Sequence, residues 1–220
     1  MKIDDWGLID YNIAWDKQEL IFRNAIDLKT KELATDDVLV LCEHPHVYTL
    51  GKSGDEHNML LNYIQLQAAH AQFVKTNRGG DITYHGPGQL VGYPIFDLSN
   101  FKIGLKQYIY LVEEAIIRTL ADYNIETTRL DGATGVWLDV DKPTCRKISA
   151  IGVRSSKFVT MHGFALNINT DLTYFNHINP CGFIDKGVTS MQKELGKLID
   201  MKEVKEKIIK QFNALFVSVQ

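Results

Sequence analysis

One stretch of the chain, RGGDITYHGPGQLVGYP from Arg78 to Pro94, restricts the possible folds more than any other segment. It holds five glycines and two prolines within seventeen residues, and Tyr84 and His85 lie near its centre. Glycine adopts positive φ angles at little cost and lets the backbone approach another group closely. Such residues are typical of a glycine-rich hairpin or of the wall of a binding site, and they leave both interpretations open.

The rest of the chain predicts helices and strands in mixed order. Helical patterns are found over residues 15–33, 59–70, 106–123 and 201–216. Strands are expected over residues 37–42, 73–76 and 89–96, and hairpins over 125–139 and 147–168. Because the hairpins make part of the sheet antiparallel, we expect an α/β or α+β fold with a mixed sheet flanked by helices.

Length and charge are typical of one globular domain spanning residues 1–220. Of the 220 residues, 45% are hydrophobic, and no repeat, linker or low-complexity segment divides the chain. The net charge of −3 disfavours general binding to nucleic acid. No apolar stretch approaches the roughly 20 residues that cross a bilayer, and MKIDDWGLIDYN is not a secretory signal. We therefore expect a cytoplasmic protein that binds neither nucleic acid nor membranes.

The three cysteines differ in their surroundings. Their number is odd and no CxxC spacing occurs, which disfavours a disulfide framework and a cysteine-based zinc site. Cys42 belongs to an apolar strand, as buried cysteines usually do. Cys181 follows Pro180 and precedes Gly182, which predicts an accessible turn. A nucleophilic thiol there needs its thiolate form, which a nearby cation favours.

Lys147 opens a predicted strand, KISAIGVR, that is otherwise small and apolar. Strict alternation would place Ala150 and Gly152 on one face, where they leave a shallow groove, and Lys147 and Ile151 on the other. A strand-end lysine whose ammonium reaches solvent is the structural alternative. The sequence does not by itself bring Lys147 beside Cys181.

Three histidines lie close together in the sequence, but their spacing does not favour a metal site. His44, His46 and His57 fall within EHPHVYTLGKSGDEH, but neither HExxH nor a paired Cys–His arrangement accompanies them. A complete phosphate-binding GxxxxGK[ST] motif is absent as well. We predict no metal site. His85 and His162 lie beside glycines in strand-like segments, as hydrogen-bonding pocket residues would.

Several segments together resemble one known family. The glycine-rich stretch, KISAIGVR (Lys147–Arg154), HGFALN (His162–Asn167) and NPCGF (Asn179–Phe183) are similar to the signature segments of the lipoate-biosynthesis octanoyltransferases. EHPHVYTLG (Glu43–Gly51) resembles the N-terminal motif of that family, although the family commonly has a proline where this chain has His46. The resemblance runs in order from about residue 37 to about residue 190.

This resemblance implies the fold of the catalytic domains of biotin and lipoate protein ligases. It also implies a catalytic dyad, Cys181 and Lys147, the two residues that their own surroundings single out, and no cofactor. The substrate-contacting segments of the family fall on three stretches of this chain: Arg78, Gly79, Gly80, Asp81, Ile82, Thr83, Tyr84 and His85; Ala150, Ile151 and Gly152; and Gly163, Phe164 and Ala165.

The activity that the resemblance implies is octanoyl transfer in two steps, through a thioester on Cys181. The implied donor is octanoyl-acyl carrier protein, and the implied acceptors are lipoyl domains of 2-oxoacid dehydrogenase complexes and the glycine cleavage H protein. One alternative is an ATP-dependent lipoate ligase of the same fold, which would need a triphosphate site and no cysteine nucleophile. Another is a non-catalytic domain that binds acylated carrier protein, which would have no use for both Lys147 and Cys181.

Overall fold

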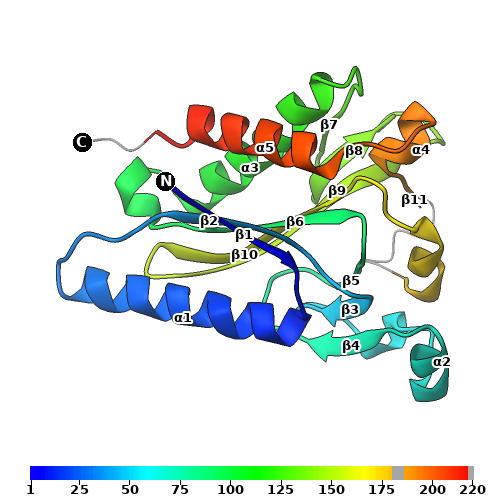
Figure 1. The fold of residues 1–220 in the computed structure, drawn as a ribbon, viewed down its shortest axis with the longest axis horizontal. Coiled ribbons are helices and arrows are strands. Elements are labelled where there is room, and N and C mark those ends of the chain that lie inside the picture. Colours follow the sequence, from blue (N-terminus) through cyan, green and yellow to red (C-terminus); the bar gives the residue numbers. More distant parts are fainter. Residues whose placement is uncertain (180–185, 218–220) are drawn as a thin grey trace.

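The computed structural model describes residues 1–179 and 186–217, and a mixed β-sheet of eight strands dominates it (Figure 1). In spatial order the strands are β1 (Lys2–Leu8), β2 (Val38–Glu43), β6 (Gln89–Ile95), β10 (Val159–Asn167), β9 (Arg146–Ser156), β8 (Ala133–Leu138) and β7 (Thr128–Leu130), with β11 (Gly187–Val188) paired to β9. The β1–β2 and β9–β11 pairs are parallel and the other pairs are antiparallel. The predicted mixed sheet and both predicted hairpins, β7–β8 and β9–β10, are confirmed.

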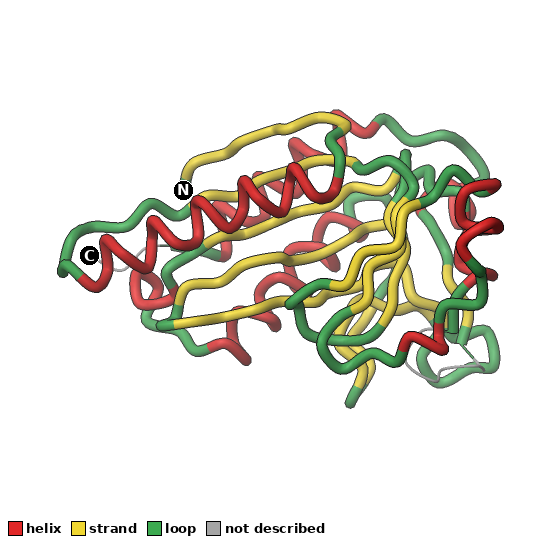
Figure 2. The backbone as a smooth tube through the Cα atoms, turned by 90° about the horizontal axis from the view of Figure 1, so that it is seen from below, coloured by secondary structure: helices red, strands yellow, loops and turns green. Residues whose placement is uncertain are grey.

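Helices cover both faces of this sheet. α1 (Tyr11–Thr30) lies across one face, whereas α3 (Leu105–Ala121) and α5 (Met201–Leu215) lie together on the other (Figures 1 and 2). The carboxylate of Asp10 accepts hydrogen bonds from the first turn of α1, and Asp200 caps α5 in the same way. Apolar side chains of α3 and α5 form the main core with β2, β6, β8, β9 and β10. None of the helices in residues 1–179 and 186–217 is long and apolar enough to cross a membrane.

A smaller sheet lies below the amino-terminal end of β6 in Figure 1 and contains β4 (Gln72–Lys75), β3 (Val47–Leu50) and β5 (Ile82–His85) in that order. An aromatic cluster packs on it, in which Tyr84 stacks on Tyr174 with ring centroids 4.9 Å apart. The remaining short elements are η1 (Glu56–Asn58), α2 (Tyr63–Ala68), η2 (Leu98–Phe101), η3 (Leu172–His177) and α4 (Met191–Leu195).

The glycine-rich stretch is not a hairpin. Its two strands, β5 and β6, belong to different sheets, and the turn at Gly86–Gly88 carries the chain from the small sheet to the large one. Gly88 has a φ of +79°, and a Cβ there would lie 2.6 Å from the carbonyl oxygen of Asn169. The hairpin interpretation is therefore wrong, and the stretch instead joins the two sheets at the place where the pocket lies.

Candidate active site

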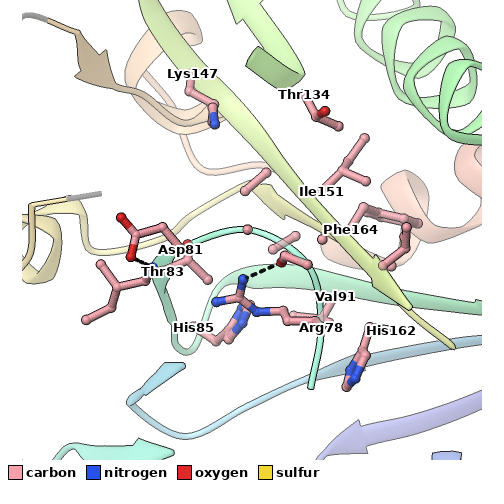
Figure 3. Close-up of a pocket in the computed structure, with 18 of the residues that line it drawn as sticks. Arg78, Asp81, Thr83, His85, Val91, Thr134, Lys147, Ile151, His162 and Phe164 are labelled. Atoms are coloured by element: carbon pink, nitrogen blue, oxygen red, sulfur yellow. Dashed lines mark hydrogen bonds between the residues drawn. The ribbon is translucent and has the colours of Figure 1, made fainter. Parts of the chain in front are cut away.

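A pocket of about 640 Å³ lies between the two sheets (Figure 3). Strands β9 and β10 form one wall and the glycine-rich segment that leads into β5 forms another. Tyr11 at the start of α1 and Leu105 and Ile109 of α3 contribute to the lining, as do Gly132–Thr134 and Trp137 near and within β8. Apolar side chains and main chain thus make up most of the lining, with a few polar groups among them, as is usual for small-molecule sites.

The wall formed by Arg78–Gly80 is fixed by hydrogen bonds on two sides. The amide of Gly79 donates to the carbonyl oxygen of Val153 on β9 at 2.9 Å. The guanidinium of Arg78, which is 8% exposed, donates from Nη2 to the carbonyl oxygen of Thr49 at 2.6 Å and to its Oγ1 at 2.9 Å. Because both β9 and β3 hold it, this wall is preorganised for a ligand.

Two glycines allow the close approach of this wall. A Cβ on Gly152 would lie 2.8 Å from the carbonyl oxygen of Gly79, and a Cβ on Gly51 would lie 2.2 Å from that of Gly80. Gly80 itself has a φ of +84°. Gly152, which weakens a strand without a packing gain of its own, is therefore explained by the main chain that crosses it.

Buried polar side chains line the pocket from α1, β5, β6 and β10. Nδ1 of His85 lies 2.8 Å from Gln89 Oε1, and Nε2 of His162 lies 2.6 Å from Asn77 Oδ1. Burial lowers the pKa of both histidines to about 3. Burial likewise raises the pKa of Tyr11 to about 12, and its ring stacks on that of His85. These groups are therefore neutral at pH 7 and offer hydrogen bonds without charge.

Lys147 reaches the pocket because the β8–β9 register is irregular. Trp137 pairs with Lys147, whereas its neighbour Val136 pairs with Ser149, so β9 holds one extra residue between the two pairs. The ammonium of Lys147 lies 4.5 Å from the centroid of the Trp137 ring. Figure 3 shows the side chain extending into the pocket from one end of β9.

The extra residue corrects the strict alternation expected for β9. Ile148 packs into the same core cluster as Ile151, although the two are an odd number of residues apart. Alternation over this strand was therefore wrong, and Lys147 lines the pocket together with Ala150 and Gly152. Sequence reasoning could not find the irregularity, because it depends on the pairing with β8.

Of the predicted dyad, Lys147 belongs to the described residues and Cys181 does not. Cys181 lies outside the described residues, as does the rest of residues 180–185. Phe175 and Lys186, on either side of that segment, both line the pocket. Cys42 and Cys145 are buried, and burial raises the pKa of the Cys42 thiol well above its usual range. The expectation that Cys42 is a buried strand residue is confirmed.

The three histidines of the segment EHPHVYTLGKSGDEH contact separate partners. Nε2 of His44 lies 2.6 Å from the Tyr93 hydroxyl, and Nδ1 of His46 lies 2.7 Å from the Tyr84 hydroxyl. His57 is exposed and contacts Asp55. Within residues 1–179 and 186–217, no three His, Cys, Asp or Glu side chains are placed to hold a metal ion.

The structure brings most of the predicted substrate-binding residues to one pocket. Of the three predicted stretches, Tyr84 alone does not line it, because its hydroxyl turns to His46. Sequence reasoning missed Tyr11, Tyr93 and Lys186. Tyr93 lies within the GYP of the glycine-rich stretch, so its place in that stretch could have indicated it, whereas Tyr11 belongs to an unremarkable amphipathic helix.

Comparisons with known proteins match almost the whole chain. The family model of the lipoyl protein ligase A/B catalytic domain matches residues 10–213. The octanoyltransferase of Bacteroides fragilis (strain YCH46) is 56% identical over 214 residues, which cover 97% of this chain and 97% of that protein. The octanoyltransferase of Flavobacterium johnsoniae is 55% identical over 223 residues, which cover 98% and 96%.

Solved structures with the same fold are more distant in sequence. A putative lipoate protein ligase from T. acidophilum with bound lipoic acid has a TM-score of 0.68 at 14% identity, covering 97% of this chain and 85% of its own. The biotin protein ligase of Aquifex aeolicus, in complex with biotin and ATP, has a TM-score of 0.56 at 15% identity, covering 98% and 70%. At such identities the likeness shows the fold alone, and the fold expected from the sequence is confirmed.

Proposed function

Since the chain belongs to the lipoyl protein ligase A/B catalytic-domain family and its relatives at 53–57% identity are octanoyltransferases, we propose that it transfers octanoyl groups from octanoyl-acyl carrier protein to a lysine of lipoyl domains. The acceptors are lipoyl domains of 2-oxoacid dehydrogenase complexes and the glycine cleavage H protein. Octanoyl transfer in protein lipoylation follows from the family. The donor, the acceptors and the route through Cys181 are our proposal.

The observation that supports the proposal best is a pocket whose lining combines Lys147 with neutral polar groups and small residues. Small residues on β9 and β10, Ala150, Gly152, Gly163 and Ala165, leave a narrow space beside the fixed Arg78–Gly80 wall. An octanoyl chain in this space gains about 0.8 kcal/mol for each methylene removed from water. Because His85 and His162 remain neutral, neither histidine carries a charge that would lose solvent when the chain enters.

In the first step, the Cys181 thiolate attacks the thioester carbonyl of the donor, the bond between that carbon and the donor sulfur breaks, and the departing carrier thiolate takes a proton from the Lys147 ammonium. The ammonium of Lys147 favours the thiolate before this step. In the second step, the amine of the acceptor lysine attacks the new thioester and the bond to Cys181 breaks. Lys147 takes the proton of the attacking amine and returns a proton to the departing thiol.

The ATP-dependent ligase alternative has less support. The structures that are ligases match at 14–15% identity and show the fold alone, whereas the relatives above 50% identity are octanoyltransferases. A ligase of this kind would have to activate a free carboxylic acid with ATP. The transferase that we propose uses a donor that is already activated as a thioester.

The experiment that tests the proposal mixes the purified protein with octanoyl-carrier protein and no ATP. We expect an octanoyl mass adduct on the protein, and we expect it to disappear when a lipoyl domain is added. A stable complex without any adduct would point to the binding domain. Octanoylation of the lipoyl domain only from free octanoate and ATP would point to the ligase. Either result would contradict the proposal.

A further inference from the structure

We propose that Lys186 is a second ammonium group of this site and a positioning residue for Lys147, and that it acts through the Trp137 ring that both lysines contact. The inference rests on the proposed function, in which Lys147 must hold a proton in one step and release it in the other. Lys186 makes no bond to substrate in this proposal. Its proposed role is to position the Lys147 amine and to affect the pKa of that amine.

Both ammonium groups lie against one indole. The Nζ atom of Lys147 is 4.5 Å from the centroid of the Trp137 ring and that of Lys186 is 5.8 Å from it. The two nitrogens are therefore at most about 10 Å apart, because both distances are measured to the same point. The ring itself is 1% exposed, and its Nε1 donates to the carbonyl oxygen of Ala133 at 2.9 Å, which fixes its orientation.

The backbone that follows Lys186 is bound to the strand that carries Lys147. β11 pairs with β9 in parallel, with Gly187 opposite Arg146 and Val188 opposite Lys147. The amide of Thr189 donates to the carbonyl oxygen of Lys147 at 2.9 Å. Since β10 pairs with β9 only from Ser149 onward, β11 occupies the place beside β9 where β10 has ended. Lys186 therefore directly precedes a strand that is bound to β9 beside Lys147.

This arrangement has two opposing effects on the protonated form of Lys147. The face of an indole attracts an ammonium group within about 6 Å of its centroid, so the ring holds both side chains near the pocket. Two like charges close together disfavour the charged form of each other, so Lys186 makes the protonated form of Lys147 more costly. A lysine beside another cation is more easily deprotonated and becomes a better base. The amine that must accept a proton in the transfer step is thereby made ready to do so.

The other ionisable groups that line the pocket do not substitute for the repulsion between Lys186 and the protonated form of Lys147. Among the described residues that line it, the charged side chains besides the two lysines are Arg78 and Asp81. Arg78 is bound to the main chain of β3, and one carboxylate oxygen of Asp81 accepts from Asn58 Nδ2 at 2.7 Å. The titratable groups that remain, Tyr11, His85, Tyr93 and His162, are neutral at pH 7 because burial disfavours their charged forms.

A measurement that needs no acyl transfer tests the coupling of the two lysines. Trace labelling of lysine amines with acetic anhydride, from about pH 6 to about pH 11, reports the fraction of each amine that is neutral. Mass spectrometry of the peptide that contains Lys147 gives its curve in the wild type, in Lys186→Met and in Lys186→Arg. Lys210→Met, on the exposed face of α5, is the control for loss of a distant lysine.

We expect the Lys147 curve to move up by about one pH unit in Lys186→Met, the size of shift that two charges about 10 Å apart give near a protein surface. Lys186→Arg keeps the charge and should follow the wild type, as should Lys210→Met. Transfer from the octanoylated protein to a lipoyl domain at pH 7 should fall about tenfold in Lys186→Met and should recover in Lys186→Arg.

A wild-type labelling curve in Lys186→Met would overturn the inference. Equal losses in Lys186→Met and Lys186→Arg would also overturn it, because packing and not charge would then be responsible. If the wild-type protein forms no octanoyl adduct, the proposed function fails, while the labelling curves still decide whether Lys186 acts on Lys147. The two failures are therefore distinguishable.

Discussion

A glycine on the neighbouring strand lies beside the Lys147 side chain. Gly135 of β8 has a φ of +130°, and a Cβ there would lie 2.6 Å from the carbonyl oxygen of Ser149, whereas its distance of 3.4 Å to Cε of Lys147 would be an ordinary contact. The main chain of β9 therefore requires a glycine at this position. The Lys147 side chain passes next to it and places its ammonium at the Trp137 ring.

Lys147→Arg separates the two roles proposed for this residue. Arginine keeps the positive charge that favours a thiolate, but it does not deprotonate in proteins and cannot act as a base. We expect acylation of the protein to be retained in part and transfer to the lipoyl domain to fall by roughly 10²–10⁴, the usual contribution of a general base. Single-turnover measurements of each step check this, and a wild-type transfer rate would show that the base is another group.

The three cysteines provide a test of where the acyl group is carried. Cys181→Ser should abolish transfer, whereas Cys42→Ser and Cys145→Ser should keep much of it, because both of these thiols are buried. Peptide mapping of the octanoyl adduct locates the modified residue directly. An adduct on Cys42 or Cys145 would disprove the assignment.

At the scale of elements, β9 lines the space that we propose for the acyl chain, and its small side chains would then determine how long a chain fits. Ala150→Leu adds a branched side chain to a strand position that lines the pocket and pairs with Ala165. We expect octanoyl transfer to fall at least tenfold and shorter acyl donors, such as butanoyl, to be affected less, because each lost methylene contact is worth about 0.8 kcal/mol. The ratio of transfer rates for octanoyl and butanoyl donors measures this.

Ala121→Leu is the matched control for this substitution. Ala121 is exposed at the end of α3, away from the pocket, and the change adds the same atoms. Its ratio of rates should equal that of the wild type. If Ala150→Leu also leaves the ratio unchanged, the acyl chain does not lie along this part of β9.

Elements with a clear period could be predicted from the sequence, and those that depend on pairing could not. The helix predicted at 106–123 is α3 (Leu105–Ala121), because its apolar stripe packs on the sheet. The helix predicted at 59–70 shrinks to the six residues of α2, none of them buried. β1 was missed because KIDDWGL is acidic and only half-buried at the edge of the sheet.

The same distinction holds for the residues of the site: motifs could be read from the sequence, and tertiary packing could not. The motifs located Arg78–Thr83, Lys147 and the small residues of β9 and β10, all of which line the pocket. The sequence predicts Tyr84 among them, but Tyr84 does not line the pocket, and its ring packs with Tyr174 instead. Tyr11 could not be found, because its place in the lining results from the packing of α1 across the sheet.

At the scale of the whole molecule, buried histidines make stability depend on pH. Burial lowers the pKa of His44 to about 4 and that of His85 and His162 to about 3. The unfolded chain binds protons at these residues from about pH 6.5 downward, whereas the folded protein does not until a lower pH. Stability is therefore lost as the pH falls from about 6.5 toward 3. Between pH 7 and pH 5 we expect urea unfolding to show a loss of roughly 1–2 kcal/mol for each histidine.

His162→Asn isolates one of these contributions. His162 has a φ of +61°, a conformation that asparagine accepts more readily than most residues. The variant should lose less stability than the wild type when the pH is lowered from 7 to 5, by roughly the contribution of one histidine. An identical loss in both proteins would show that His162 is protonated in the folded state at pH 5.

The hydrogen bond from Gly79 to Val153 also has a consequence for the order of events when the chain folds. This bond and the stacking of Tyr11 on His85 join parts of the chain that are far apart in sequence, and both border the pocket. Contacts with large sequence separation form late, because a long loop has to close before they contribute. Helices α1, α3 and α5 depend on local hydrogen bonds and can form earlier. A refolding chain should therefore regain its helical circular dichroism first, and its capacity to be octanoylated only in a later and slower phase.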